Sequence, residues 1–243
     1  MSNSSSSRAA QGVRRAATAT TLPDAPRAVP RRRAASGEQL GEDTARAMIL
    51  QGAARVFGQR GVRLATVEDI LTAARVSRRT FYRLYEGKED VMLALYMIGT
   101  QGLVDACRAI VEQEREPLRQ ILRFIDAHLS NASQLGRLVF VLGGEAQRRE
   151  SSLHARRIEV HEVLTDLLVG GASAHYGKPL DPLLFRSVLL ALEGVSRLVL
   201  EEGDEGRAVA DSSIERARRV MTRVATAALA GQGAGVAPLP TLK

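Results

Sequence analysis

The chain has 243 residues, of which 45% are apolar and 25% are charged, a mixture typical of folded globular proteins and not of disordered chains. Its single cysteine, Cys107, excludes an intrachain disulfide, and no apolar run approaches the roughly 20 residues that a membrane-spanning helix needs. We therefore expect a soluble, cytoplasmic protein without membrane contact, held together by the burial of apolar side chains.

The net charge of +7 is concentrated in the first part of the chain. Residues 1–103 hold 16 basic and nine acidic side chains, whereas residues 104–243 hold 18 of each. We therefore expect a polyanion to bind the N-terminal part, and the neutral remainder to have another task.

The first 41 residues are rich in Ser, Ala, Thr, Pro and Arg, with Arg31, Arg32 and Arg33 in a row. Such a segment cannot bury enough apolar surface to fold, so a disordered basic tail is predicted. Three interpretations remain open: a solvated tail, a basic arm that follows a DNA backbone, and a transit peptide, although no amphipathic stripe supports the last.

From residue 42 onward, apolar residues recur at helical spacing, and no alternating β-branched run is long enough for a sheet, which predicts an all-α fold. The first helix is predicted over 43–60, with Gly61 in the left-handed conformation that ends it. Thr66 can cap a short second helix, and Ser77 can cap a third that ends near Leu84. The later helices are predicted to begin near Glu89 and Pro117 and to span 133–147, 152–176, 181–202 and 208–230.

Two short helices that are joined by a tight turn and rest on an apolar first helix have the organisation of a helix-turn-helix, which inserts its second helix into a DNA major groove. Six apolar side chains can lock these helices together: Val67, Ile70, Leu71, Val76, Phe81 and Tyr85. They leave Arg78, Arg79, Tyr82 and Arg83 projecting from the third helix. The competing interpretation is a charged surface on an ordinary helical hairpin, and the N-terminal charge excess favours DNA.

This stretch resembles the N-terminal domain of TetR-type transcriptional regulators over residues 44–96. Five motifs carry the resemblance: Phe57-Gly-Gln-Arg-Gly61, Ala65-Thr-Val-Glu-Asp-Ile70, Ala73-Ala-Arg-Val-Ser77, Thr80-Phe-Tyr82 and Tyr85-Glu-Gly-Lys-Glu89. Two positions depart from the family pattern. Arg75 stands in the turn where the family usually has Gly, and Leu84 occupies a place often filled by a polar residue.

The resemblance implies a division of the DNA contacts between bases and phosphates. Base edges would be met by Arg78, Arg79 and Thr80, because arginine can bind guanine through two hydrogen bonds and a threonine methyl can contact thymine. Phosphate contacts, which position the protein without selecting sequence, would come from Thr66, Ser77, Tyr82, Arg83 and Lys88. Ser77 would also cap the third helix, Arg83 could serve either group, and Tyr82 could instead be a half-buried aromatic that closes the hairpin.

The last two predicted helices carry apolar residues in steps of three and four, which is the spacing of a coiled-coil seam. The predicted seam consists of Leu184, Val188, Ala191, Val195 and Leu198 on the first helix and Ile214, Ala217, Met221 and Val224 on the second. The resemblance implies a four-helix homodimer interface here, so that two copies read a palindromic operator. The alternative is packing within one chain, since further leucines widen the apolar face.

The resemblance also implies a pocket for a small-molecule effector among the later helices. The candidates are bulky or polar groups that interrupt apolar stripes: Phe124, His128, Phe140, His161 and Phe185. Each could equally be an ordinary core residue. No metal site and no cofactor are predicted, because His154 and His161 lie two helical turns, roughly 10 Å, apart.

The expected organisation is a disordered basic tail (1–41), a helix-turn-helix domain (42–90), a helical ligand-binding and dimerisation domain (91–230) and a flexible C-terminal tail (231–243). We expect a homodimeric, sequence-specific transcriptional regulator, a repressor like most of the family it resembles, that an effector releases from its operator. An enzyme is not expected, because the sequence shows no nucleophile-and-base pair, phosphate-binding loop or metal spacing. The alternative is a helical protein-interaction adaptor without DNA binding.

Overall fold

The computed structural model describes residues 33–202 and 211–230, and within these ranges every element is a helix. The elements are α1 (Arg33–Leu64), α2 (Val67–Ala74), α3 (Arg78–Leu84), α4 (Lys88–Gln113), α5 (Pro117–Leu135), α6 (Arg137–Ala146), α7 (Leu153–Tyr176), α8 (Pro182–Glu202) and α9 (Asp211–Ala230). The predicted all-α fold is confirmed. None of these described helices is long and apolar enough to cross a membrane.

The first helix differs from its prediction at both ends. It begins at Arg33, so residues 33–41 of the predicted tail are helical, whereas residues 1–32 and the predicted tail 231–243 lie outside the described residues. Adding turns to an existing helix requires no new nucleation, so good helix formers such as Ala and Glu extend it without an apolar stripe. Gly61 has the expected positive φ (75°), but its ψ of 160° is not left-handed helical, and a last helical turn follows to Leu64.

Hydrogen-bonded caps fix the start of both short helices. The Thr66 hydroxyl accepts from the Asp69 backbone N–H at 3.2 Å, and the Asp69 carboxylate accepts from the Thr66 N–H at 3.0 Å, which completes the predicted capping box. The Thr66 hydrogen bonds to this carboxylate lower the pKa of Asp69. Ser77 caps α3 by accepting from the Thr80 N–H at 3.0 Å. These caps set the direction in which α3 leaves the turn.

The apolar side chains form two cores, and one of them joins distant parts of the sequence. The predicted helix-turn-helix segment packs around a core that includes Ile49, Phe57, Ile70 and Phe81, all 0% exposed. Side chains of α6 and α7 also belong to this core. At Gly52 the chain passes so close to α2 that an added Cβ would lie 2.7 Å from the Ala74 nitrogen. The second core fills the space between α4, α5, α7, α8 and α9.

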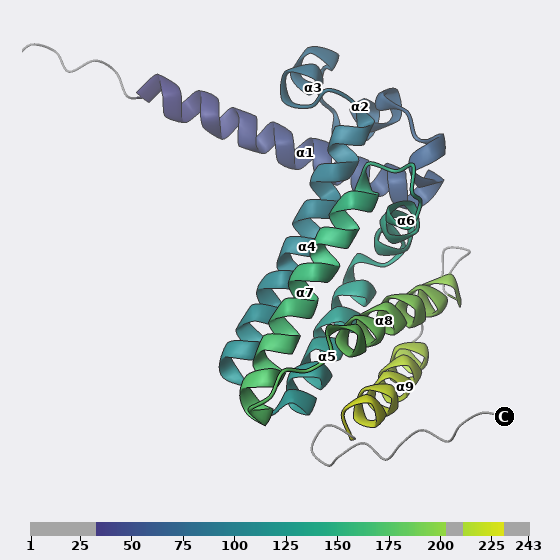
Figure 1. The fold of residues 1–243 in the computed structure, drawn as a ribbon. Helices are drawn as coiled ribbons and strands as arrows, with labels where there is room; N and C mark the ends of the chain where they lie inside the picture. Colours follow the sequence, from purple (N-terminus) through teal and green to yellow (C-terminus); the bar gives the residue numbers. More distant parts are fainter. Residues whose placement is uncertain (1–32, 203–210, 231–243) are drawn as a thin grey trace, which may run out of the picture.

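Figure 1 shows how these cores are arranged along an elongated molecule. The helices α2 and α3 lie at one end, α4 and α7 run side by side along its length, and α8 and α9 lie toward the other end. The short helix α6 lies beneath α1, between the two parts. The protein thus separates an N-terminal unit from a larger helical unit, with α4 passing through both.

The turn between α2 and α3 contains Arg75 in the left-handed conformation (φ 55°, ψ 39°), at the position where glycine would be expected. This conformation costs a side-chain-bearing residue about 1–2 kcal/mol, and glycine adopts it without that penalty. We expect Arg75→Gly to raise the free energy of unfolding by roughly 0.5–1 kcal/mol, after the larger unfolded-state entropy of glycine is subtracted. Thermal unfolding followed by circular dichroism measures the change. Arg75→Ala is the control, because it keeps the Cβ and should not stabilise; equal stabilisation by both variants would assign the effect to the arginine side chain.

Candidate functional site

The helix α3 presents a basic outer face and buries its inner face. Phe81 (0% exposed) and Leu84 (9% exposed) face the core, so Leu84, which departs from the family pattern, does not belong to the outer set. The exposed side chains are Arg78, Arg79, Tyr82 and Arg83. Tyr82 is 49% exposed and its ring meets Phe81 edge-on at a centroid distance of 5.3 Å. The arrangement matches the one predicted for a groove-reading helix.

Two of the three arginines on the outer face of α3 form ion pairs with carboxylates of neighbouring helices. Arg78 forms an ion pair with Glu68 of α2, and the Arg83 Nε lies 3.6 Å from a Glu42 carboxylate oxygen on α1. Both pairs are exposed, so DNA can exchange for either carboxylate at little cost. Within the described residues, no carboxylate forms an ion pair with Arg79, which leaves its guanidinium available for a guanine.

Three residues that were predicted to contact DNA, Thr66, Ser77 and Thr80, already use their hydroxyl groups in hydrogen bonds within the protein. Thr66 donates its hydroxyl proton to Asp69 at 2.7 Å, and the Ser77 and Thr80 hydroxyl oxygens lie 2.8 Å apart. Thr66 and Ser77 are exposed and Thr80 is half-buried. Their hydroxyls serve the caps of α2 and α3, so a DNA contact at these positions would fall to a backbone N–H group or to the threonine methyl.

Lys88, predicted to contact phosphate, has a different environment in the structure. Its ammonium donates to the backbone carbonyls of Val62 (3.1 Å) and Ala65 (2.8 Å), with that of Arg63 at 3.4 Å. An ammonium has three N–H donors, and these three carbonyls occupy them. Lys88 therefore ties the start of α4 to the segment that ends α1, and its predicted phosphate contact would require these hydrogen bonds to break.

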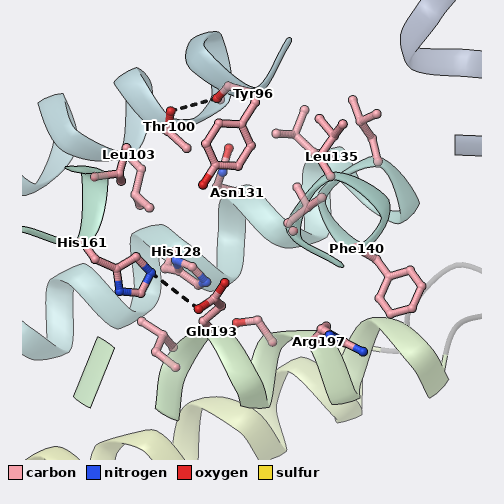
Figure 2. Close-up of a pocket in the computed structure, with 18 of the residues that line it drawn as sticks. Tyr96, Thr100, Leu103, His128, Asn131, Leu135, Phe140, His161, Glu193 and Arg197 are labelled. Atoms are coloured by element: carbon pink, nitrogen blue, oxygen red, sulfur yellow. Dashed lines mark hydrogen bonds and ion pairs between the residues drawn. The ribbon is translucent and has the colours of Figure 1, made fainter. Parts of the chain in front are cut away.

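A cavity of about 230 Å³ lies in the larger unit. Side chains from α4, α5, α6, α7 and α8 form its wall, as Figure 2 shows. Most of the wall is apolar and includes Leu103, Leu135, Leu142, Leu164, Leu189 and Leu192. The polar side chains lie in one region of the wall. In Figure 2, Tyr96 and Asn131 lie above His128, His161 and Glu193. A concave, mostly apolar space with a few convergent polar groups is the usual form of a small-molecule site.

Four of the five predicted pocket residues line this cavity: Phe124, His128, Phe140 and His161. Phe185 is not among the lining residues. Its side chain is 1% exposed and packs in the second core, one helical turn before the lining residue Leu189. The sequence prediction missed Tyr96, Glu193 and Arg197. Glu193 carried a usable signal, since it is an acidic residue within an otherwise apolar stretch of α8.

Glu193 is the centre of a half-buried polar cluster at the cavity wall. Arg157 of α7 donates through Nε at 2.8 Å and through a second nitrogen to the other carboxylate oxygen. His161 Nε2 lies 3.5 Å from Oε2, and Gln147 donates to Oε1 at 3.4 Å. Burial acts to raise the pKa of Glu193, but the hydrogen bonds from Arg157 and His161 outweigh it and lower the pKa to about 2. The carboxylate is therefore ionised at neutral pH.

His128 and Tyr96 are held in their neutral forms. Burial lowers the pKa of His128 to about 4, and the ring lies 6.2 Å from that of Phe124. Burial, together with the Glu193 charge, raises the pKa of Tyr96 to about 12. The neutral His128 side chain lines the cavity, so it offers one hydrogen-bond donor and one acceptor to whatever enters.

The predicted dimer seam divides into a buried part and an exposed part. Val188 of α8 and Ile214, Ala217 and Met221 of α9 are 9% exposed or less and pack in the second core of this chain, which is the alternative that the sequence left open. These positions lie on the faces that the two helices turn toward their own chain. Leu184, Ala191 and Val195 are half-buried, whereas Leu198 (62%) and Val224 (38%) remain exposed. Three further exposed apolar residues accompany them: Leu183, Leu190 and Val220.

The described residues contain neither a reactive cysteine nor a cluster of metal-binding side chains. Cys107 is 0% exposed, and burial raises the pKa of its thiol to about 12, so it is not a reactive thiol. No group of three His, Cys, Asp or Glu side chains in the described ranges could hold a metal ion. His154 lies 3.2 Å from the Ala146 carbonyl oxygen and does not reach the cavity.

Comparison with known proteins finds a family that matches the N-terminal unit and solved structures that share the fold. Residues 49–95 match the family described as bacterial regulatory proteins, tetR family. The chain is 27% identical over 139 residues, 55% of its own length and 70% of the other, to the HTH-type transcriptional repressor KstR2 of Mycobacterium tuberculosis.

Two solved structures share the fold. The fatty acid degradation regulator FadR of Bacillus halodurans has a TM-score of 0.61 at 20% identity, over 73% of this chain and 94% of that one. FadR of Bacillus subtilis in complex with stearoyl-CoA has a TM-score of 0.60 at 16% identity, over 79% and 99%.

The carbonyl contacts of Lys88 predict that this residue stabilises the fold. We expect Lys88→Met to lower the free energy of unfolding by about 1–3 kcal/mol, because it leaves partly buried carbonyls without donors. Arg63→Met, which removes a neighbouring exposed charge, should leave stability nearly unchanged. Chemical denaturation measures both variants. Unchanged stability of Lys88→Met, combined with a salt dependence of DNA binding reduced by about one unit per subunit, would instead assign the ammonium to a phosphate.

Proposed function

We propose that this chain, which belongs to the TetR family of bacterial transcriptional regulators, binds a palindromic operator as a homodimer and represses transcription until a small-molecule effector enters the cavity of the larger unit. The family supplies the regulatory function, and its members are not enzymes. The operator, the dimer and the effector are the parts that require experiment.

The observation that carries the proposal is the basic outer face of α3 on a rigid support. Caps at Thr66 and Ser77 and the buried Phe81 side chain hold α3 in place, and Arg79 projects from it. Side chains on a fixed helix can form base contacts of defined geometry, whereas a flexible basic segment attracts DNA of any sequence. In this proposal Arg79 and Arg78 select sequence, the latter after leaving Glu68, and Tyr82 and Arg83 contact phosphates.

Two helices can transmit ligand binding to α3. The helix α4 begins beside the N-terminal unit at Lys88 and borders the cavity at Gly99. A Cβ at Gly99 or Gly102 would meet nothing within 4 Å, so close packing does not explain these two glycines. The helix α6 borders the cavity through Phe140 and packs against α1. A ligand that displaces either helix changes the spacing of the two recognition helices in a dimer.

The exposed apolar residues of α8 and α9 support a dimer interface on that surface. We define the outer face as Leu183, Leu190, Leu198, Val220 and Val224, of which Leu183 and Leu198 are more than 60% exposed. Apolar side chains of this size in one region are typical of a protein interface. In the proposed homodimer the outer face packs against its symmetry mate and sets the two α3 helices about one DNA turn, roughly 34–36 Å, apart.

The cavity supports an effector with a large apolar part. FadR of Bacillus subtilis was solved with stearoyl-CoA, a molecule with a long apolar chain. The leucine-rich wall described here suits an apolar body, while its polar cluster indicates that part of the ligand forms hydrogen bonds.

A selection from random duplexes, followed by titrations, tests the DNA-binding part of the proposal. We expect the selected sequence to be palindromic. Arg79→Ala should lose about 1–3 kcal/mol of discrimination at one base pair of each half-site, while affinity for a scrambled duplex changes much less. Equal losses on both duplexes would contradict base reading by Arg79. DNA binding that does not depend on salt concentration would contradict the proposed DNA-binding function and favour the adaptor interpretation.

Tyr82→Phe is the matched control for Arg79→Ala. It removes one exposed hydroxyl, keeps the ring against Phe81, and should weaken binding to operator and scrambled duplex by the same factor.

The outer face predicts the oligomeric state. Leu190→Glu places a charge at its centre and should convert the dimer to a species with the mass of one chain, 26.2 kDa, in sedimentation equilibrium. Val163→Glu on α7, at a residue 41% exposed and outside the outer face, should leave the dimer intact. A Leu190→Glu dimer of unchanged affinity would place the interface elsewhere.

A further inference from the structure

We propose that the effector is an uncharged molecule, with an apolar body and one hydroxyl or carbonyl group that hydrogen-bonds to His128, and that the polar side of the cavity rejects a carboxylate or ammonium group. This inference deepens the proposed function and depends on the cavity being its effector site.

Glu193 has no capacity left for a cationic ligand. A carboxylate offers about four lone-pair positions, and four donor atoms surround this one: two from Arg157, one from Gln147 and one from His161. An ammonium entering here would lose its hydration shell and find no unoccupied acceptor on the carboxylate. The ion pair with Arg157 also cancels the negative charge locally.

The basic groups nearest to His128 already face a carboxylate, because Arg157 and His161 are both paired with Glu193. Arg157 is bound to Glu193 through two nitrogens, and His128 is neutral at physiological pH because it is buried. Arg197 also belongs to the cavity wall, but Figure 2 shows it directed toward Phe140 and away from His128 and His161. Its guanidinium donates to Gln147 at 2.6 Å. A carboxylate beside His128 would therefore be desolvated without compensation.

Two polar atoms at the cavity wall lack hydrogen-bond partners within the described residues. The Ser196 hydroxyl is buried without a hydrogen bond, and so is the Nδ1 atom of His161. Ser196 lines the same cavity as His128, whose neutral ring supplies one donor and one acceptor. A hydroxyl can bind at either nitrogen of such a ring, as a donor to one or an acceptor from the other, whereas a carbonyl can use only the donor. Buried polar groups in folded proteins normally have partners, so these atoms favour a ligand that supplies them.

The experiment compares matched probes on two apolar bodies of different shape. One series is 1-decanol, decanoate and decylamine, and the other is 1-adamantanol, adamantane-1-carboxylate and 1-adamantylamine. Each probe is titrated at pH 7.5 into the full-length protein by calorimetry, below its aggregation concentration. We expect the alcohol of at least one series to bind about tenfold or more tightly than both charged partners.

Two variants connect this preference to the named groups. His128→Phe keeps a ring of similar size and should reduce alcohol affinity roughly three- to tenfold, which brings it close to the charged probes. Ser196→Ala, a smaller change, should show a reduction in the same direction if His128→Phe does not fold. Val163→Ala, on the exposed face of α7, is the control and should bind every probe as the unmodified protein does.

Two results would overturn the inference: a charged probe that binds as tightly as its alcohol, or a preference for the alcohol that survives both variants. Absence of binding by all six probes would also count against it. None of these results bears on Arg79 or the operator, because the DNA titrations contain no probe. Failure of the effector class and failure of the proposed regulator can therefore be told apart.

Discussion

The packing of α6 against the N-terminal core is the contact on which the arrangement of the molecule depends. Leu142 and Ala146 of α6 are buried in the same core as Ile49 and Phe57 of α1, with Leu153 at the start of α7 beside them. The same helix borders the cavity, and Leu142 belongs both to this core and to the cavity wall. Close-packed cores shift between discrete arrangements more readily than they deform, so a change in the position of α6 has to be accommodated by the helices that support α3.

A second constraint is the polar cluster that joins α7 to α8 inside an otherwise apolar unit. The bidentate pair of Arg157 and Glu193 fixes the register of the two helices, since sliding either by one turn would bury two uncompensated charges. The cluster thus contributes specificity of packing more than it contributes net stability. It also leaves one wall of the cavity polar, while the leucines of neighbouring helices make the others apolar.

Sequence reasoning succeeded where the signal is local. The capping box at Thr66, the cap at Ser77, Pro117 in the first turn of α5 and the burial of Phe81 all follow from residue type and helical spacing. It failed where two partners compete for one surface. Both faces of α8 are apolar, so periodicity could not assign Val188 to the chain's own core and Leu190 to its outer surface.

The sequence alone could not predict polar contacts between residues that lie far apart along the chain. Lys88 lies 23 residues from the Ala65 carbonyl that it binds, and Arg157 lies 36 residues from Glu193. A lysine that contacts phosphate and a lysine that caps a helix occupy the same place in a motif. Only the fold determines which acceptor is closer, and here the carbonyls at the end of α1 are within hydrogen-bond distance.

The burial of Cys107 makes this protein well suited to site-specific spectroscopic labelling. It is the only cysteine in the chain, it is fully enclosed, and its thiolate is strongly disfavoured, so thiol reagents should leave the native protein unmodified. A cysteine introduced on the exposed face of α3 would then be the single reactive position in each subunit. In the proposed homodimer, spin labels attached there would report the separation of the two α3 helices as a distance distribution, without first removing a native thiol.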